Sequence, residues 1–277
     1  RARSPKARAR RERALVGWHG GAYHSARSCP PRPKVNLKSP SSREASGVVT
    51  SASVDAKEPP RSQAVVQARG LVFRYGPGPT ILDGIDLDIG VGEIVAFVGL
   101  AGSGKTTLLR LIAGDLEPTG GTLERPARRS SGGRTMVGYA PVDGAHYETL
   151  SGRDNALFFA RAAGLRRREA EGAVAEHMAL LGLEAEAQLP VARYGPGARR
   201  KLLLVQALAH RPALAILDEP FRGLEPSARE ALIQVLRLHA ARRGTVVVAS
   251  TDLVLLPELV DRLLFLHEGR IVRGGRV

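Results

Sequence analysis

The sequence predicts an α/β fold with an N-terminal antiparallel β-subdomain and an inserted α-helical subdomain. Three observations carry this prediction. Residues 65–72 and 81–89 alternate apolar and polar side chains, as strands with one buried face do. Residues 94–98 and 214–217 are wholly apolar, which is typical of buried parallel strands. Helical periodicity follows the first of these apolar runs and returns in the stretch 151–193.

The composition excludes several classes of protein. Hydrophobic residues make up 43% and charged residues 25% of the 277 positions, as in ordinary globular proteins. No apolar run approaches the roughly 18 residues that a membrane helix needs. The single cysteine, Cys29, excludes an internal disulfide framework and a multi-cysteine metal site. The seven histidines show no metal-ligand spacing and are treated as non-ligands.

The net charge of +14 is concentrated at the N-terminus. Residues 1–63 carry 14 Lys and Arg against 4 Asp and Glu, whereas the rest carry 27 against 23. Residues 1–62 lack any period and are broken by prolines, so we expect a disordered basic extension rich in Arg, Pro and Ser. We favour a solvated extension. The alternatives are a transit peptide and a segment that touches anionic lipid or nucleic acid. Residues 63–277 then form the folded domain, and no specific nucleic-acid partner is expected.

A glycine-rich phosphate loop follows the first apolar run. Strand, loop and helix occur in that order, and the loop fits the pattern GxxxxGK[ST]. Its residues are Gly99, Leu100, Ala101, Gly102, Ser103, Gly104, Lys105 and Thr106, with Thr107 opening the helix. Glycines let backbone N–H groups surround phosphate oxygens, Lys105 reaches the β- and γ-phosphates, and the Thr106 hydroxyl is a Mg²⁺ ligand. The sequence therefore predicts a P-loop NTPase core that binds ATP and Mg²⁺.

An acidic pair ends the second apolar run. Asp218 and Glu219 follow residues 214–217, at the carboxyl end of a predicted central strand, where open α/β sheets bind ligands. We expect Asp218 to hold Mg²⁺ and Glu219 to act as the catalytic general base. A capping box of Ser227 and Glu230 is expected to open the next helix, which runs to Ala241.

Over about residues 64–277 the chain resembles the nucleotide-binding subunit of ATP-binding cassette (ABC) transporters, in the style of the exporter branch. Residues 72–76 resemble the A-loop, so that Tyr75 would stack on adenine. Residues 137–141 resemble the lead into the Q-loop, and residues 150–157 resemble the start of the helical subdomain, placed at about 146–193. The resemblance implies an ATPase of the P-loop type.

Four family positions are degenerate. Val142 stands at the Q-loop glutamine, and Glu225 at the D-loop aspartate. Thr251 stands at the switch histidine. In place of the Ser-Gly-Gly signature the chain has Gly195, Pro196 and Gly197. Valine cannot ligate Mg²⁺, proline has no N–H to donate and threonine cannot shuttle a proton as histidine does. We therefore expect ATP binding to be preserved and turnover to be slow.

The resemblance also implies partners. It implies a homo- or heterodimer of ATP-binding subunits with ATP at the interface, and a separate membrane permease that docks around residues 142–159. The subunit would then sit at the cytoplasmic face of the membrane. The alternative is a catalytically degenerate regulatory subunit without useful turnover. A family member that acts on ribosomes or DNA, and the product of a decayed gene, are weaker alternatives.

Overall fold

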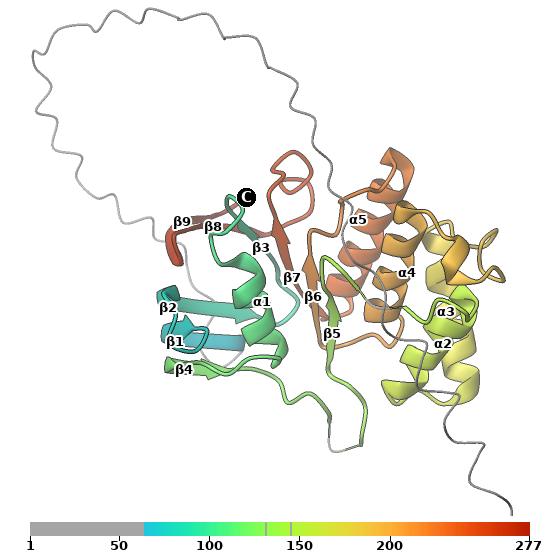
Figure 1. Cartoon of the computed structure of the whole chain (residues 1–277), viewed down its shortest axis with the longest axis horizontal. Helices are drawn as coiled ribbons and strands as arrows, with labels where there is room; N and C mark the ends of the chain where they lie inside the picture. The colour runs from blue at the N-terminus through green and yellow to red at the C-terminus, as the bar shows by residue number, and fades with distance from the viewer. Residues whose placement is uncertain (1–63, 131, 145) are drawn as a thin grey trace, which may run out of the picture. The chain divides into compact units, whose positions relative to one another are not determined.

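The computed structural model describes residues 64–130, 132–144 and 146–277. The expected basic extension, residues 1–62, lies outside this part of the chain. The described elements are drawn in Figure 1. In chain order they are β1 (Ala64–Arg74), β2 (Thr80–Gly90), β3 (Ile94–Val98), α1 (Lys105–Ala113), β4 (Gly120–Glu124), β5 (Val137–Ala140), α2 (Gly152–Ala162), α3 (Arg167–Leu180), the 3₁₀ turn η3 (Val191–Arg193), α4 (Pro196–Leu208), β6 (Leu214–Asp218), α5 (Pro226–Ala241), β7 (Thr245–Ser250), β8 (Arg262–His267) and β9 (Arg270–Arg276).

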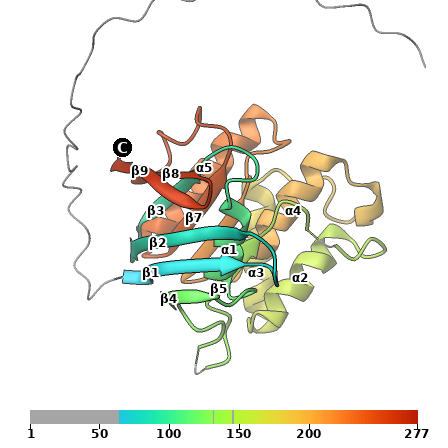
Figure 2. The same ribbon diagram turned by 60° about the vertical axis from the view of Figure 1, so that its left-hand side comes forward.

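The smaller sheet is antiparallel and has the strand order β2-β1-β4. Its first two strands contain the alternating stretches 65–72 and 81–89, and their apolar residues Val66, Ala68, Leu82 and Ile85 are buried. Figure 2 shows the strands of this sheet in front of α1. The prediction of an N-terminal antiparallel subdomain is confirmed.

The larger sheet has the order β5-β6-β7-β3-β8-β9. The first five of these strands pair in parallel and β9 closes the edge as an antiparallel hairpin with β8. Strands β3 and β6 are buried at every residue, as their wholly apolar sequences indicate. The register pairs Asp218 with Ala249 and Val98 with Ser250. The carboxyl ends of β3, β6 and β7 therefore meet at one edge.

Each face of the larger sheet has its own core layer. Val95 and Phe97 of β3 pack with α1 and the smaller sheet. Ile94, Ala96 and Val98 point to the opposite face, in the layer that includes apolar residues of α2, α3, α4 and α5. This division follows from the two-residue period of a strand. The mixed α/β architecture is confirmed, and α1 is held between the two sheets where the phosphate loop enters it.

Helix α5 corrects one sequence prediction. Its N-cap is Glu225 and its first residue is Pro226, so the expected capping box of Ser227 and Glu230 is wrong. Proline is well suited to the first helical position because its φ is already helical and its missing N–H would have no intrahelical partner. That local preference sets the start of the helix before Ser227. In the described part of the chain, no helix is long and apolar enough to cross a membrane.

Candidate nucleotide site

One cavity of about 800 Å³ lies at the carboxyl edge of the larger sheet. It collects predicted site residues from segments far apart in the sequence. The predicted residues that line it are Tyr75, Ala101, Gly102, Gly104, Lys105, Thr106, Thr107, Val142, Asp218, Glu219 and Thr251. The volume suits a small organic ligand. The position, at the carboxyl ends of parallel strands, is where open α/β sheets bind ligands.

The phosphate loop places a cation under this cavity. Lys105 is 6% exposed, and its Nζ donates to the carbonyl oxygens of Gly99 at 2.7 Å and Leu100 at 2.8 Å. Burial lowers the pKa of Lys105, while Glu219 and Asp218 oppose that shift. Gly104 caps α1 at φ 101°, in the left-handed region that favours glycine. The loop therefore combines a fixed ammonium group with a helix N-terminus, an arrangement suited to phosphate.

Thr106 and Asp218 meet although 112 positions separate them. The Thr106 hydroxyl donates to Asp218 Oδ2 at 2.6 Å. Asp218 is 1% exposed. Burial raises its pKa, and the hydrogen bond from Thr106 with the charges of Arg200 and Lys105 opposes the rise. A hydroxyl and a carboxylate at this distance are oxygen donors of the kind that Mg²⁺ prefers.

Glu219 is held in an unusual backbone conformation. Its φ is 48°, in a region that costs a non-glycine residue of order 1 kcal/mol or more. Its N–H donates to Ala249 O at 2.8 Å, and the Ser250 hydroxyl lies 3.4 Å from its Oε2. Ser250 also accepts from the N–H of Asp252. Ser250 thus links Glu219 to the segment that contains Thr251, a role that the sequence did not reveal.

Tyr75 lies in the wall of the cavity, and the residue is 46% exposed. It packs edge-to-face on Phe73, with ring centroids 4.8 Å apart. Its hydroxyl lies 3.4 Å from Thr107 Oγ1 and from Arg110 Nη1. Tyr75 is thus a partly exposed aromatic residue at the cavity wall, and its stacking on adenine stays a prediction.

The degenerate positions divide into two groups. Val142 and Thr251 line the nucleotide cavity. Gly195, Pro196, Gly197 and Glu225 are not part of its wall. Gly195 is the N-cap of α4 without a side-chain cap bond, and Pro196 is its first residue. The signature-equivalent end of α4 instead packs on the segment that follows Glu219, since a Cβ at Gly197 would lie 3.1 Å from Gly223 O.

Glu225 is paired within its own chain. Lys201 of α4 donates its Nζ to Glu225 Oε1. The hydrogen bond from Lys201 lowers the pKa of Glu225. Lys201 is itself largely buried, so this contact fixes the longer acidic side chain against the start of α4.

Arg200 is a buried residue near the cavity that the sequence analysis did not single out. It is 7% exposed, and its guanidinium donates to the carbonyls of Pro141 at 2.6 Å, Val142 at 3.2 Å and Asp218. One buried cation therefore ties the exits of β5 and β6 together beneath the cavity. Burial lowers the pKa of Arg200, and Asp218 and Glu219 oppose the shift. No local pattern could have found it, because its partners are backbone atoms of distant strands.

The comparisons with known proteins agree with this geometry. The family model described as "ABC transporter" matches residues 82–222. The chain belongs to the ABC transporter family. It is 32% identical over 218 residues to the Nod factor export ATP-binding protein I of Burkholderia orbicola. The aligned region covers 77% of this chain and 71% of that protein.

Further relatives within the ABC family support the same assignment. The chain is 35% identical over 216 residues to the Fe(3+) ions import ATP-binding protein FbpC of Streptomyces coelicolor, which spans 76% of this chain and 62% of that protein. A solved structure described as the ATP binding subunit of an ABC transporter superposes with a TM-score of 0.69 at 26% identity, over 77% of this chain and 90% of that one. This ABC protein is thus an ATP-binding subunit of a class whose members hydrolyse ATP.

Proposed function

We propose that this ABC subunit binds MgATP in the cavity described above and couples ATP binding and slow hydrolysis to a separate membrane permease. The observation that carries the proposal is the single cavity shared by the phosphate loop, Asp218 and Glu219. Lys105 and the backbone of residues 99–107 bind the phosphates. Tyr75 stacks on the adenine, and Glu219 acts as the general base toward the attacking water.

The residues present fit a magnesium ion. Thr106 Oγ1 and Asp218 Oδ2 lie 2.6 Å apart at the cavity wall. Mg²⁺ is bound in such sites through one or two protein oxygens together with substrate phosphates and water. When bound, the ion neutralises charge that develops on the phosphates. Thr106 and Asp218 would hold it, and Lys105 adds a positive charge on the same side.

Slow hydrolysis follows from the side chains that line the cavity. Val142 and Thr251 replace a glutamine and a histidine that the family places near the reacting phosphate. Loss of a single transition-state donor typically reduces the rate by about 10²–10³. Losses within one network are not additive. The ground-state contacts of Lys105 and the loop remain, so binding is retained more fully than turnover.

A dimer would account for the position of the signature-equivalent residues outside the chain's own cavity. The start of α4 with Gly195, Pro196 and Gly197 forms no wall of that cavity. In the family's head-to-tail dimer this helix end would face the nucleotide of the other subunit. We propose a homo- or heterodimer of this kind, in which this chain contributes a signature without the serine hydroxyl.

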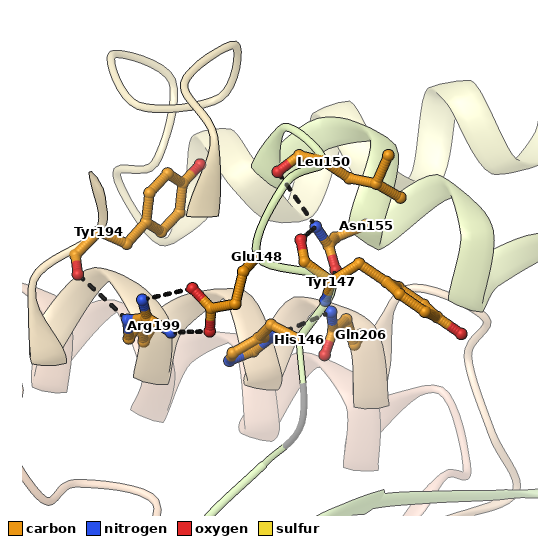
Figure 3. A network of polar contacts seen from close by, with 8 residues as sticks. All are labelled: His146, Tyr147, Glu148, Leu150, Asn155, Tyr194, Arg199 and Gln206. Carbon is orange, nitrogen blue, oxygen red and sulfur yellow. Dashed lines mark hydrogen bonds and ion pairs between the residues drawn. The ribbon is translucent and has the colours of Figure 1, made fainter. Parts of the chain in front are cut away.

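The segment between β5 and α2 provides a face for the permease. Figure 3 shows how Asn155 fixes it. The Asn155 amide is buried, accepts from the N–H of Tyr147 and donates to the carbonyls of Tyr147 and Leu150. Glu148 is anchored to α4 by a bidentate ion pair with Arg199, at 2.6 and 2.7 Å. These contacts hold the loop rigidly and leave its outer side chains free to bind.

Exposed aromatic rings mark this face. Tyr147 is 47% and Phe158 is 48% exposed, and their rings pack edge-to-face at 5.0 Å. Phe158 and Leu150 also line a groove of about 860 Å³. A rigid aromatic patch beside a groove is typical of an interaction site. We propose that a cytoplasmic segment of the permease binds here, which places the subunit at the cytoplasmic side of the membrane.

We propose that the transporter exports its substrate, as members of the exporter branch do. The Nod factor protein named above carries an export function in its description. A fluoroquinolones export protein of Mycobacterium tuberculosis is also 32% identical, over 216 residues. The iron protein FbpC is described as an importer, so direction is tested by reconstitution with the permease and measurement of which side of the membrane loses substrate.

The test of the proposed function is ATP turnover by the full chain, with Glu219→Gln as the matched control. We expect both proteins to bind ATP with similar affinity, because glutamine keeps the size of the side chain and removes only its basicity. We expect the wild type to hydrolyse MgATP measurably faster than the variant. If the two proteins bind ATP equally and hydrolyse it at the same rate, the enzyme interpretation is refuted and the chain is a nucleotide-binding regulatory subunit. Failure to bind ATP at all would refute the site.

A further inference from the structure

A second cavity lies at the opposite edge of the larger sheet. It measures about 530 Å³ and is bordered by the residues that lead into β5, β6 and β7, among them Met136, Ala213 and Gly244. It shares no lining residue with the nucleotide cavity. Because parallel strands enter at one edge and leave at the other, the two cavities are separated by the length of these strands.

Four arginines line this space, which we call the basic cavity: Arg134, Arg211, Arg242 and Arg243. They come from the loop before β5, the segment after α4 and the end of α5. The single carboxylate in its wall, Glu176, already accepts from Arg211 at 2.9 Å. Among the residues that the structure describes, Arg134, Arg242 and Arg243 have no carboxylate partner. Like charges collected in this way repel one another unless an anion lies between them.

Backbone conformation gives a second, independent observation. Arg211 has φ 50° and Arg243 has φ 66°, so both occupy the left-handed region just beyond a helix. Glycine is the usual residue at such positions because it pays no steric penalty there. A cation near a helix C-terminus is favourable in itself, but that effect does not require arginine at a strained residue. Both residues with this backbone conformation place arginine side chains in the wall of the basic cavity.

Three histidines also line this cavity, and His177 Nδ1 already lies 2.8 Å from the Ala173 carbonyl oxygen. His177, His210 and His239 are well separated in the sequence and all line the basic cavity. Both ring nitrogens of His210 and the Nε2 of His239 are buried and make no hydrogen bond of good geometry in the described part of the chain, although backbone atoms of Val137, Gln206 and Pro212 lie near these rings. A buried polar atom left unpaired costs free energy unless a ligand or water pairs with it. The guanidinium groups in the same wall are suited to an anion.

From these observations we infer that the basic cavity binds an organic phosphate, with a phosphate dianion between the guanidinium groups and an apolar body against the remaining wall. Arginine matches phosphate in bidentate geometry. The surplus of arginine over carboxylate favours a dianion over a single carboxylate. Leu180, Leu208 and Leu238 supply apolar surface in the same wall, which inorganic phosphate alone would leave unused.

Such a ligand would join separate parts of the subunit. His177 and Leu180 belong to α3 of the helical subdomain, whereas Arg242 ends α5 and Arg134 precedes β5. A ligand whose phosphate is held by Arg134 and Arg242 and whose apolar body packs on Leu180 would therefore hold α3 against the strand entries. The inference does not depend on hydrolysis at the nucleotide cavity, and its test can fail or succeed separately.

The experiment is a calorimetric titration of the full chain with phenyl phosphate, in the presence of saturating MgADP so that the nucleotide cavity is filled. We expect one binding site. Arg134→Gln and Arg242→Gln, from two different elements, should each weaken it about tenfold or more, because each loses a charged hydrogen bond to phosphate. Arg273→Gln removes the same charge from exposed strand β9 and should leave the affinity within about twofold. Unchanged ATP affinity and circular dichroism establish that the variants are folded.

Four results would overturn the inference. The first is that the wild type does not bind phenyl phosphate, and the second is that Arg273→Gln loses as much affinity as the cavity variants. The third is that benzoate binds as tightly as phenyl phosphate. The fourth is that Lys105→Ala abolishes binding while Arg242→Gln leaves it intact. The last result would assign the probe to the nucleotide cavity. Binding of inorganic phosphate as tight as that of phenyl phosphate would refute the apolar part of the site.

Discussion

Replacement of Arg200 by methionine should destabilise the subunit, because three backbone carbonyls would lose their hydrogen-bond donor. Methionine fills a similar volume but donates no hydrogen bond to Pro141, Val142 or Asp218. Hydrogen bonds from a charged donor contribute about 1.5–3 kcal/mol each. Three of them outweigh the several kcal/mol that desolvation of a buried guanidinium costs. We therefore expect a net loss of about 2–4 kcal/mol in the free energy of unfolding, since the carbonyls are left buried and unpaired.

For a domain of this size, that loss lowers the melting temperature by about 5–12 °C. The assay is thermal unfolding, with Arg199→Met as the matched control. Arg199 is the preceding residue of the same helix, but it pairs with the exposed Glu148, so its loss is screened by solvent and should cost much less. Arg200→Lys keeps the charge and should recover only part of the stability, because one ammonium group cannot span three carbonyls. If Arg200→Met melts at the same temperature as Arg199→Met, the clamp between β5 and β6 is refuted.

Three further predictions concern the nucleotide site and pH. Thr106→Val should reduce Mg²⁺-dependent turnover about a hundredfold while Thr106→Ser retains it, because only the hydroxyl can ligate the ion; steady-state kinetics over a range of Mg²⁺ concentrations will show this, and equal loss in both variants would point to packing instead. Val142→Gln with Thr251→His should raise kcat at least about tenfold with little change in ATP affinity, because both restore polar groups to the cavity wall; unchanged kcat would mean that the signature limits the rate. Burial lowers the pKa of His210 and of His239 to about 4, so the unfolded chain binds more protons below about pH 6.5; stability is intact above that pH and falls toward pH 4, by up to about 3 kcal/mol for each histidine. His210→Phe should flatten this acid dependence in urea unfolding, exposed His267→Gln should not, and identical pH profiles for the two variants would contradict the assignment.

Local sequence was sufficient for the elements whose chemistry is carried by neighbouring residues. The run 94–98 followed by the glycine-rich loop specified β3, the phosphate site and α1 together, because strand burial, left-handed glycine and helix N-terminus occur within a few positions of one another. The two-residue period of residues 65–72 and 81–89 likewise specified the antiparallel sheet. Where two local signals competed, as Pro226 and Ser227 did at the start of α5, the proline prevailed through its fixed φ.

The sequence by itself determined that this protein has a phosphate loop, an acidic pair and degenerate catalytic positions. Only the tertiary structure decided that Thr106 meets Asp218, that Ser250 supports Glu219, and that Arg200 clamps two strand exits. It also brought His177, His210 and His239, which show no ligand spacing in the chain, to one basic cavity. The physical reason is that these contacts join residues on separate strands and helices. Their distances are set by the order of the strands in the sheet and by the packing of helices on its faces, which no local pattern encodes.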